Sequence, residues 1–439
     1  MTPIQLELHD LQSGILHPRP SPYVGAYLAF RVDAPGDGRR LLAHLERFIA
    51  SAAEWSSQAQ AWLTVTLTYQ GLRAIGVPHA SLDSFPEAFK EGMAARAEIL
   101  GDTGCSAPAN WEAPLGSHDV HIAIAAIAPD TVRLDVLLSE IEAGRRDLSG
   151  VVQIWRQDCY ALPTEREAFG FKDGISHPAI EGSGIPGSNP QEAPLKAGEF
   201  VLGYENELGE VAEMPQPAVL GRNGTFVVFR KLHQDVAAFR QYLRANATSP
   251  EDEELLAAKF VGRWRSGAPL SLSPDRDDPA LGADAARNND FLFQDDDPRG
   301  LKCPIGSHIR RMNPRDAVVT GEVRLHRMIR RGTNYGPHMP EGVLEDDGKD
   351  RGLCFVFVGA SLTRQFEFVQ QQWVNDGRAF AAPVEKDPLI GGGGCPFTVP
   401  TRPIRRRLQG LPRFVTTRGG EYCFAPSLSA LRWLSELHS

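Results

Sequence analysis

The sequence predicts an α+β protein made of two units, with a long irregular segment between and around them. Apolar residues recur at strand and then helix spacing over residues 23–158, and the same alternation restarts at residue 225. Between these stretches, residues 165–225 are rich in Gly, Pro, Asn and Ser, which favours loops and turns. Loops of this length inside a compact domain are often functional, so we expect this segment to contribute to a site.

The first unit is expected to alternate strands with helices. Each predicted strand is a short apolar or β-rich run, and each predicted helix carries apolar residues three and four positions apart. Strands are predicted over residues 23–32, 62–69, 121–127 and 151–158, and helices over 39–53, 71–75 and 133–142.

The second unit repeats this pattern with longer loops. A strand over 225–231 is followed by helices and by a loop over 262–300, and residues 325–331 read as either strand or loop. The remaining predicted elements are a strand over 353–359 and helices over 236–245, 251–261, 366–374 and 427–437.

Composition excludes several classes of protein. The 439 residues are 42% hydrophobic and 23% charged, as in ordinary globular proteins, and the net charge of −9 argues against nucleic acid or an anionic membrane as the main partner. The longest apolar stretch, 122–129, is too short to span a bilayer. The first ten residues, MTPIQLELHD, resemble no export signal, so we expect a cytoplasmic protein with its six cysteines reduced.

Three segments carry residues suited to chemistry. They are G-F-K-D-G-I-S-H-P over 170–178, C-P-I-G-S-H-I-R-R-M-N-P-R over 303–315, and R-M-I-R-R-G-T-N-Y-G-P over 327–337. An Asp-Gly pair alone usually marks a turn, and a lone histidine usually belongs to a core. In the second segment, however, arginines surround the histidine, and guanidinium groups suit anions such as carboxylates or propionates.

Together, these segments resemble the dye-decolorizing peroxidases, a family of haem enzymes. The first is similar to the family's G-x-x-D-G signature, the second to the segment with the proximal haem ligand, and the third to the segment with the distal arginine. Similar stretches also occur at 10–16, 198–204, 262–270 and 387–391, so the resemblance to the longer bacterial and fungal members covers nearly the whole chain. One departure is His177, where the family usually has Gln.

The resemblance implies two ferredoxin-like domains with antiparallel sheets. Residues 1–195 would form the N-terminal domain, ending with the G-x-x-D-G loop, and residues 196–439 the C-terminal domain, which binds most of a haem b. The two α+β units expected from periodicity agree with this division.

The resemblance also implies roles for individual residues. His308 would be the axial ligand of the iron, Asp173 would carry the peroxide proton, and Arg330 would stabilise developing charge. Arg331 is adjacent, and a shift of one residue in the register would exchange the two arginines. The other residues expected at the haem are Gly174, Ile175 and Ser176 of the loop, Leu353 and Phe355 as walls, and Arg311 and Arg315 at the propionates.

Two further roles stay open at this stage. The second ring nitrogen of His308 needs an acceptor, and where shorter family members have an Asp this chain has Ser361, so Glu367 and Asp387 are candidates. Surface aromatic residues could relay electrons from donors too bulky to reach the haem, or they could simply fill the core. The candidates for this relay are Trp155, Trp264, Trp373 and Tyr335.

The expected reaction is oxidation of a bulky organic donor, such as a dye or phenolic, by hydrogen peroxide through a ferryl intermediate. We expect small or polymeric aromatic donors as partners, no nucleic acid or membrane, and a monomer or homo-oligomer. A haem-binding or haem-transfer protein without turnover is the alternative, and it would need His308 but neither Asp173 nor Arg330. A protein that has lost haem and a chlorite dismutase-like enzyme are further rivals, and the second would lack the G-x-x-D-G motif.

Overall fold

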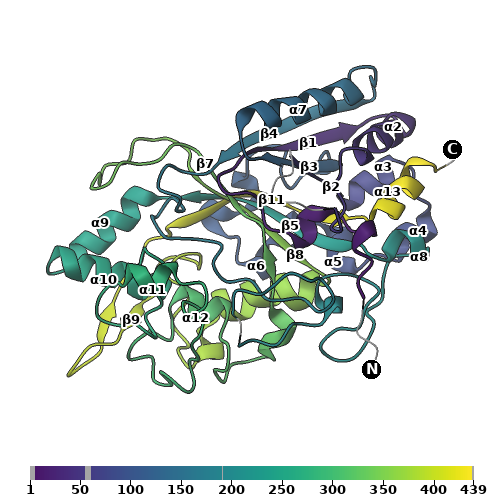
Figure 1. Ribbon diagram of the computed structural model, residues 1–439. Helices are drawn as coiled ribbons and strands as arrows, with labels where there is room; N and C mark the ends of the chain where they lie inside the picture. Colours follow the sequence, from purple (N-terminus) through teal and green to yellow (C-terminus); the bar gives the residue numbers. More distant parts are fainter. Residues whose placement is uncertain (1–4, 55–60, 190, 438–439) are drawn as a thin grey trace.

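The computed structural model describes residues 5–54, 61–189 and 191–437. Its centre is a nine-stranded sheet in the order β4-β1-β3-β2-β11-β5-β8-β6, with β7 also paired to β8. Every strand pair in this sheet is antiparallel, and helices cover it (Figure 1). The α+β class with antiparallel sheets is therefore confirmed. The expectation about an export signal falls partly on residues 1–4, which lie outside the described residues.

The first half of the sheet follows the sequence prediction closely. Asp130 caps α7, because its side chain accepts a hydrogen bond from the Arg133 backbone N–H at 2.9 Å. Figure 1 shows α2 and α7 lying over β1 and β3. The strands are β1 Val24–Val32, β2 Trp62–Leu67, β3 Ile122–Ala128 and β4 Val151–Tyr160, and the helices are α1 Ser13–Leu16, α2 Pro35–Glu46, α3 Tyr69–Ala74, α4 His79–Asp83, α5 Glu87–Glu91, α6 Ala97–Leu100 and α7 Thr131–Arg145.

The second half contains the segments that resemble the haem site. The helix expected over 366–374 is present as two π-helical turns, Leu362–Glu367 and Val369–Val374. This conformation is rare in proteins, and where it occurs it often lies at a functional site. The strands are β5 Thr225–Gln234, β6 Ile329–Arg330, β7 Thr333–Tyr335, β8 Gly352–Gly359, β9 Phe397–Val399, β10 Arg406–Leu408 and β11 Val415–Ala425, and the helices are α8 Ala218–Gly221, α9 Val236–Asn246, α10 Pro250–Val261, α11 Pro279–Ala283, α12 His308–Met312 and α13 Leu428–Ser435.

The two halves share one sheet and exchange elements. Strand β11, near the C-terminus, pairs with β2 at Phe424 and Leu67, and helix α13 packs against α2. The sheet also curls back on itself, because β4 at one end contacts β7 at the other. The expected boundary at residues 195 and 196 lies in the irregular segment between β4 and β5, and it stays a prediction.

Because side chains alternate along a strand, the curled sheet has an outer and an inner face. On β8, Leu353 and Phe355 line a cavity on the outer face, whereas Val356 and Val358 line a second cavity on the inner face. The outer cavity contains the residues that the sequence singles out.

Candidate active site

The outer cavity has a volume of about 270 Å³ and lies between the loop after residue 170, strand β8 and helix α12. It brings together side chains that are as much as 317 residues apart in the chain, from Leu100 to Thr417. The residues expected at the haem that line it are Asp173, Gly174, Ile175, Ser176, His308, Arg315, Arg330, Leu353 and Phe355.

His308 is held by a buried carboxylate. Its Nδ1 lies 2.9 Å from Asp387 Oδ2, and the other oxygen of Asp387 accepts hydrogen bonds from the backbone N–H groups of Leu389 and Ile390. Burial raises the pKa of Asp387, but His308 and these N–H groups outweigh it and hold the pKa below its usual value. An ionised acceptor at Nδ1 orients the ring and leaves Nε2 as the nitrogen for a ligand in the cavity.

Glu367, the other candidate for this acceptor, and Ser361, which stands where shorter family members have an Asp, both have different partners. Ser361 caps the first π-helical turn by accepting a hydrogen bond from the Arg364 N–H at 3.1 Å. Glu367 pairs with Arg96 and accepts a hydrogen bond from the Tyr422 hydroxyl at 2.9 Å. Of the two candidates that the sequence left open, Glu367 and Asp387, the structure places only Asp387 beside His308.

Asp173 and Arg330 form a pair in the same cavity as His308. Arg330 Nη1 lies 3.6 Å from Asp173 Oδ1, and Arg330 Nη2 donates to the Ser176 carbonyl at 3.3 Å. Burial raises the pKa of Asp173, but Arg330 and the Gly174 N–H lower it to below its ordinary value. Gly174 has a φ of 74°, in the left-handed region that favours glycine, so the sequence D-G suits this turn.

Arg331 lies on the opposite face of the sheet from Arg330. Its backbone N–H donates to the Val356 carbonyl at 2.8 Å, and its guanidinium lines the inner cavity. Because neighbouring residues of an extended chain point to opposite sides, only one of the two arginines can face Asp173. The structure places Arg330 there.

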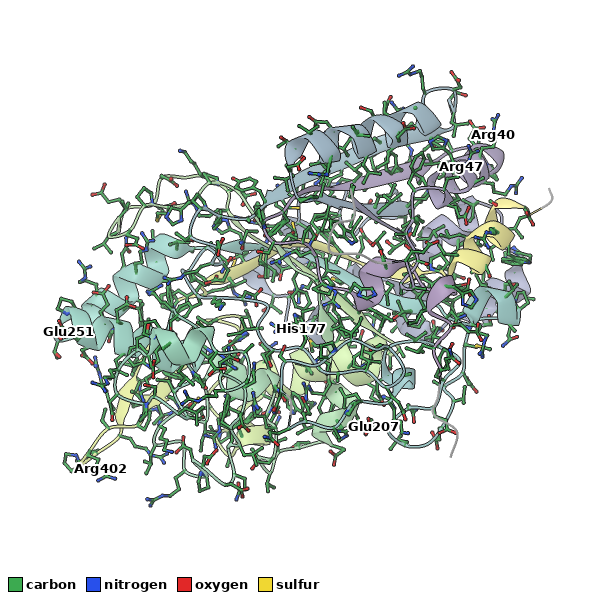
Figure 2. The ribbon with its side chains drawn as sticks, in the orientation of Figure 1. Arg40, Arg47, His177, Glu207, Glu251 and Arg402 are labelled. Carbon is green, nitrogen blue, oxygen red and sulfur yellow. The ribbon has the colours of Figure 1, made fainter. Side chains whose placement is uncertain are left out.

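His177 lies next to this pair, near the middle of the molecule (Figure 2). Its backbone N–H donates to Ser188 Oγ at 2.9 Å, and its carbonyl accepts from the Ser188 N–H at 2.8 Å. Burial, together with Arg330 and Arg331, lowers the pKa of His177 to about 3, so its ring is neutral near pH 7. The chain is anchored through backbone atoms here, which explains why the loop accommodates His in place of Gln.

Arg315 lines the cavity but Arg311 does not. The Arg315 guanidinium stacks 3.8 Å from the Phe291 ring, and burial lowers its pKa to about 10. Arg311 is fully buried, and it donates to the carbonyls of Gly306, Trp373 and Glu385. Its donors hold together the backbone around α12, so the position of Arg311 does not support the expected contact with a propionate, which stays a prediction.

Sequence reasoning missed other arginines of this cavity. Arg327 lines it and pairs with Glu192, and Arg263 lines it while donating to the Gly267 and Asn288 carbonyls. Both lie within stretches that resemble the family, 327–337 and 262–270. This position in the sequence could have indicated that the two arginines belong to the cavity.

The four aromatic residues proposed as surface relays are all buried. Trp373 and Tyr335 are 0% and 2% exposed, and Trp155 and Trp264 are 9% and 5% exposed. Their polar atoms have partners, because the Tyr335 hydroxyl donates to Asp350 at 3.1 Å and Trp155 Nε1 donates to Glu112 at 2.6 Å. Their description as surface residues is therefore wrong, and the alternative that these aromatic residues fill the core agrees with their burial.

Several known proteins similar to this chain are named dye-decolorizing or dye peroxidases. A dye-decolorizing peroxidase of Mycena epipterygia is 33% identical over 411 residues, which cover 84% of this chain and 75% of the relative. A multifunctional dye peroxidase of Amycolatopsis is 31% identical over 85% of this chain and 82% of the relative. The chain belongs to the dye-decolorizing peroxidases. No protein-family model matches it.

Solved structures of dye-decolorizing peroxidases share the fold. The fungal enzyme of Auricularia auricula-judae superposes with a TM-score of 0.85 at 29% identity, covering 98% of this chain and all of the other. An ancestral D-type dye-decolorizing peroxidase gives the same TM-score at 31% identity, with 98% and 99% coverage. The chain is thus an oxidoreductase of the peroxidase class. Within the described residues, no helix has the length and apolarity needed to cross a membrane.

The residues of the cavity fit the haem that dye-decolorizing peroxidases use. One wall offers an imidazole whose second nitrogen is hydrogen-bonded to a buried carboxylate, an arrangement that suits a metal-ligating histidine. Apolar side chains of β8 form another wall, and Arg315 and Arg327 offer cations for carboxylates.

Proposed function

We propose that this chain binds haem b through His308 and oxidises bulky aromatic donors, such as dyes and phenolics, with hydrogen peroxide. The observation that carries the proposal is that a carboxylate-oriented imidazole and an Asp–Arg pair line one cavity. A solved dye-decolorizing peroxidase that is 30% identical to this chain is a complex with 2,6-dimethoxyphenol, which supports a phenolic donor.

Bound haem would supply the iron at which peroxide is cleaved and the capacity to store its oxidising equivalents. His308 Nε2 would hold the iron, and Asp387 would keep that imidazole basic and in one orientation. Arg315 and Arg327 would neutralise the propionates.

Asp173 and Arg330 would act on peroxide itself. The ionised Asp173 carboxylate accepts the proton from one peroxide oxygen and returns it to the other, so the leaving group departs as water. The Arg330 guanidinium, fixed by the Ser176 carbonyl, stabilises the negative charge that develops as the O–O bond breaks. Neutral His177 stands beside them without adding a charge.

The test of the ligand is His308→Ala. We expect loss of bound haem or a weakly held form with an altered Soret band, because no other described histidine lines the cavity. An unchanged Soret spectrum and haem stoichiometry would reject His308 as the ligand.

The test of the chemistry is the pH profile of the peroxide reaction in Asp173→Asn. Wild-type activity should persist in mildly acidic solution, because the pKa of Asp173 is lowered and the carboxylate stays ionised. Asp173→Asn should retain haem but react slowly with peroxide at every pH. Identical rates and profiles would remove Asp173 from the mechanism.

A haem-transfer protein without turnover is the second candidate. One relative, 28% identical over 53% of this chain and 41% of that protein, is the deferrochelatase of Yersinia pestis, whose name is that of an enzyme and does not favour a protein without turnover. Such a protein has no use for the Asp173–Arg330 pair. Steady-state turnover of peroxide with a panel of dyes and phenolics separates the two, since a transfer protein would show none.

A further inference from the structure

A second cavity of about 100 Å³ lies on the inner face of the curled sheet. On β3, Ala123 and Ala125 face it and are partly exposed, whereas Ile122 and Ile124 on the other face are buried. Small side chains at the centre of a sheet leave the space open, and the remaining strand residues around it are mostly apolar. Neither the peroxide chemistry nor haem binding uses this space.

One end of the cavity is basic and lacks a counter-ion. The Arg331 guanidinium donates to the Leu16 and Arg330 carbonyls, and its buried Nε has no hydrogen-bond partner. Arg19 donates to the Gly332 carbonyl at 3.1 Å and stacks on Tyr23. No carboxylate among the described residues forms an ion pair with Arg19 or Arg331.

The surroundings of Arg331 affect the pKa of its guanidinium group. Burial, followed by the nearby Arg19 and Arg330, lowers the pKa of Arg331 to about 9. A buried cation is costly unless an anion accompanies it, so a bound anion at this end would stabilise the folded chain.

The far side of the cavity offers hydrogen-bonding groups instead of an opposing charge. Glu421 lies three strands away from Arg331, through the pairs Arg331–Val356, Val356–Phe229 and Phe229–Glu421. At a strand spacing of about 4.8 Å, this is about 14 Å along the sheet and less across its curve. Burial raises the pKa of Glu421 to about 8, so near pH 7 it is neutral and does not compensate Arg331. Trp62 also lines the cavity, and its Nε1 has no partner among the described residues.

We propose that the inner cavity is a binding site for a small aromatic carboxylate. The carboxylate would pair with Arg331 and Arg19, and one aromatic ring would lie between the alanines of β3 and the valines of β8. An apolar cavity of comparable size in another protein holds benzene, so a single ring suits the space and a long chain does not. The site is separate from the haem cavity, because residues on the opposite face of the same strands form it.

Benzoate is the probe, and isothermal titration calorimetry with the purified, haem-loaded chain measures its binding. Benzyl alcohol has the ring without the charge, and acetate has the charge without the ring. We expect benzoate to bind more tightly than either, without a change in the Soret band. This readout needs no turnover, so the proposal can fail while the proposed peroxidase function stands, and the reverse also holds.

Two variants locate the site. Arg331→Met keeps the volume and removes the charge, so benzoate should bind at least about tenfold more weakly while benzyl alcohol is unaffected. Ala125→Leu fills the cavity and should abolish binding of both, with haem content and peroxidase activity retained. If Ala125→Leu does not fold, the smaller Ala123→Val should weaken benzoate binding in the same direction.

Several results would overturn the proposal. They are no benzoate binding by the wild type, equal binding by Ala125→Leu or by Ala123→Val, or equal affinities for benzoate and acetate, which would indicate a site for any small anion. A Soret shift on binding, together with loss of binding in Arg330→Leu, would place benzoate in the haem cavity and also refute it.

Discussion

The outer and inner faces of strands β5, β8 and β11 differ in whether their carboxyl groups have a charged or imidazole partner. On the outer face, Asp173 lies beside Arg330 and Asp387 beside His308, and both carboxyl groups have a lowered pKa. On the inner face, Glu421 has only the Gly116 N–H as a partner, and its pKa rises to about 8. Carboxyl groups on the two sides of one sheet thus take opposite protonation states at neutral pH, and the presence of a cation or imidazole decides which.

The same contrast applies to the arginines. Arg330 on the outer face has a carboxylate within 3.6 Å, whereas Arg331 on the inner face has only backbone carbonyls. Arg330 and Arg331 are neighbours in the chain, yet Arg330 is suited to act on peroxide in the outer cavity and Arg331 is suited to hold an anion in the inner cavity.

The largest expected effect is on the rate of the reaction with peroxide, when Arg330 and Arg331 are each replaced by leucine in separate variants. Loss of one fixed charge-stabilising group typically slows a reaction by about 10²–10³. We expect Arg330→Leu to slow the reaction with peroxide by this factor in stopped-flow measurements of the Soret band, and Arg331→Leu to slow it much less. The reverse ranking would show that the inner arginine is the one that acts on peroxide.

Glu421→Gln tests the protonation state of the inner carboxyl group. Its pKa is raised from the ordinary 4.5 to about 8, so the folded chain holds an extra proton between these values and the free energy of unfolding falls as pH rises. The variant should remove this decline and gain up to about 3 kcal/mol at pH 7, with no such gain below pH 4.

Glu367→Gln is the matched control in denaturant unfolding. This buried glutamate pairs with Arg96, so its amide removes the buried one of the two carboxylates that pair with this cation, leaves only Glu91, and should lower stability at pH 7. If both variants changed stability in the same direction, the contrast between paired and unpaired carboxyl groups would be lost.

Asp387→Asn is expected to have a smaller effect than Arg330→Leu or Glu421→Gln. The amide keeps a hydrogen-bond acceptor at His308 Nδ1 but loses the negative charge, and such outer-sphere changes typically cost about 10–100-fold in affinity or activity. Haem retention and the rate with peroxide measure the loss. Ser361→Ala, at the position expected from shorter relatives, should leave both unchanged, and a comparable loss there would contradict the assignment of Asp387.

The sequence alone determined most of the regular structure and several of the residues that line the outer cavity. Strand β5 and helix α10 appear within a few residues of their predicted bounds, because their periodic apolar residues act locally. The residues 173–176, 308 and 330 could be selected because each lies in a short motif whose order along the chain is distinctive.

The tertiary structure alone decided features that depend on distant contacts. Strand β11, the longest of the sheet, escaped prediction because Gly419, Gly420 and Glu421 interrupt its apolar pattern, and only its partners β5 and β2 make it a strand. Arg311 and Arg315 look alike in the sequence and both donate to backbone carbonyls, yet only Arg315 lines the cavity. Likewise, the acceptor of His308 became clear only where the fold brings Asp387 to 2.9 Å across 79 residues, because a hydrogen bond depends on distance in space and not on separation in sequence.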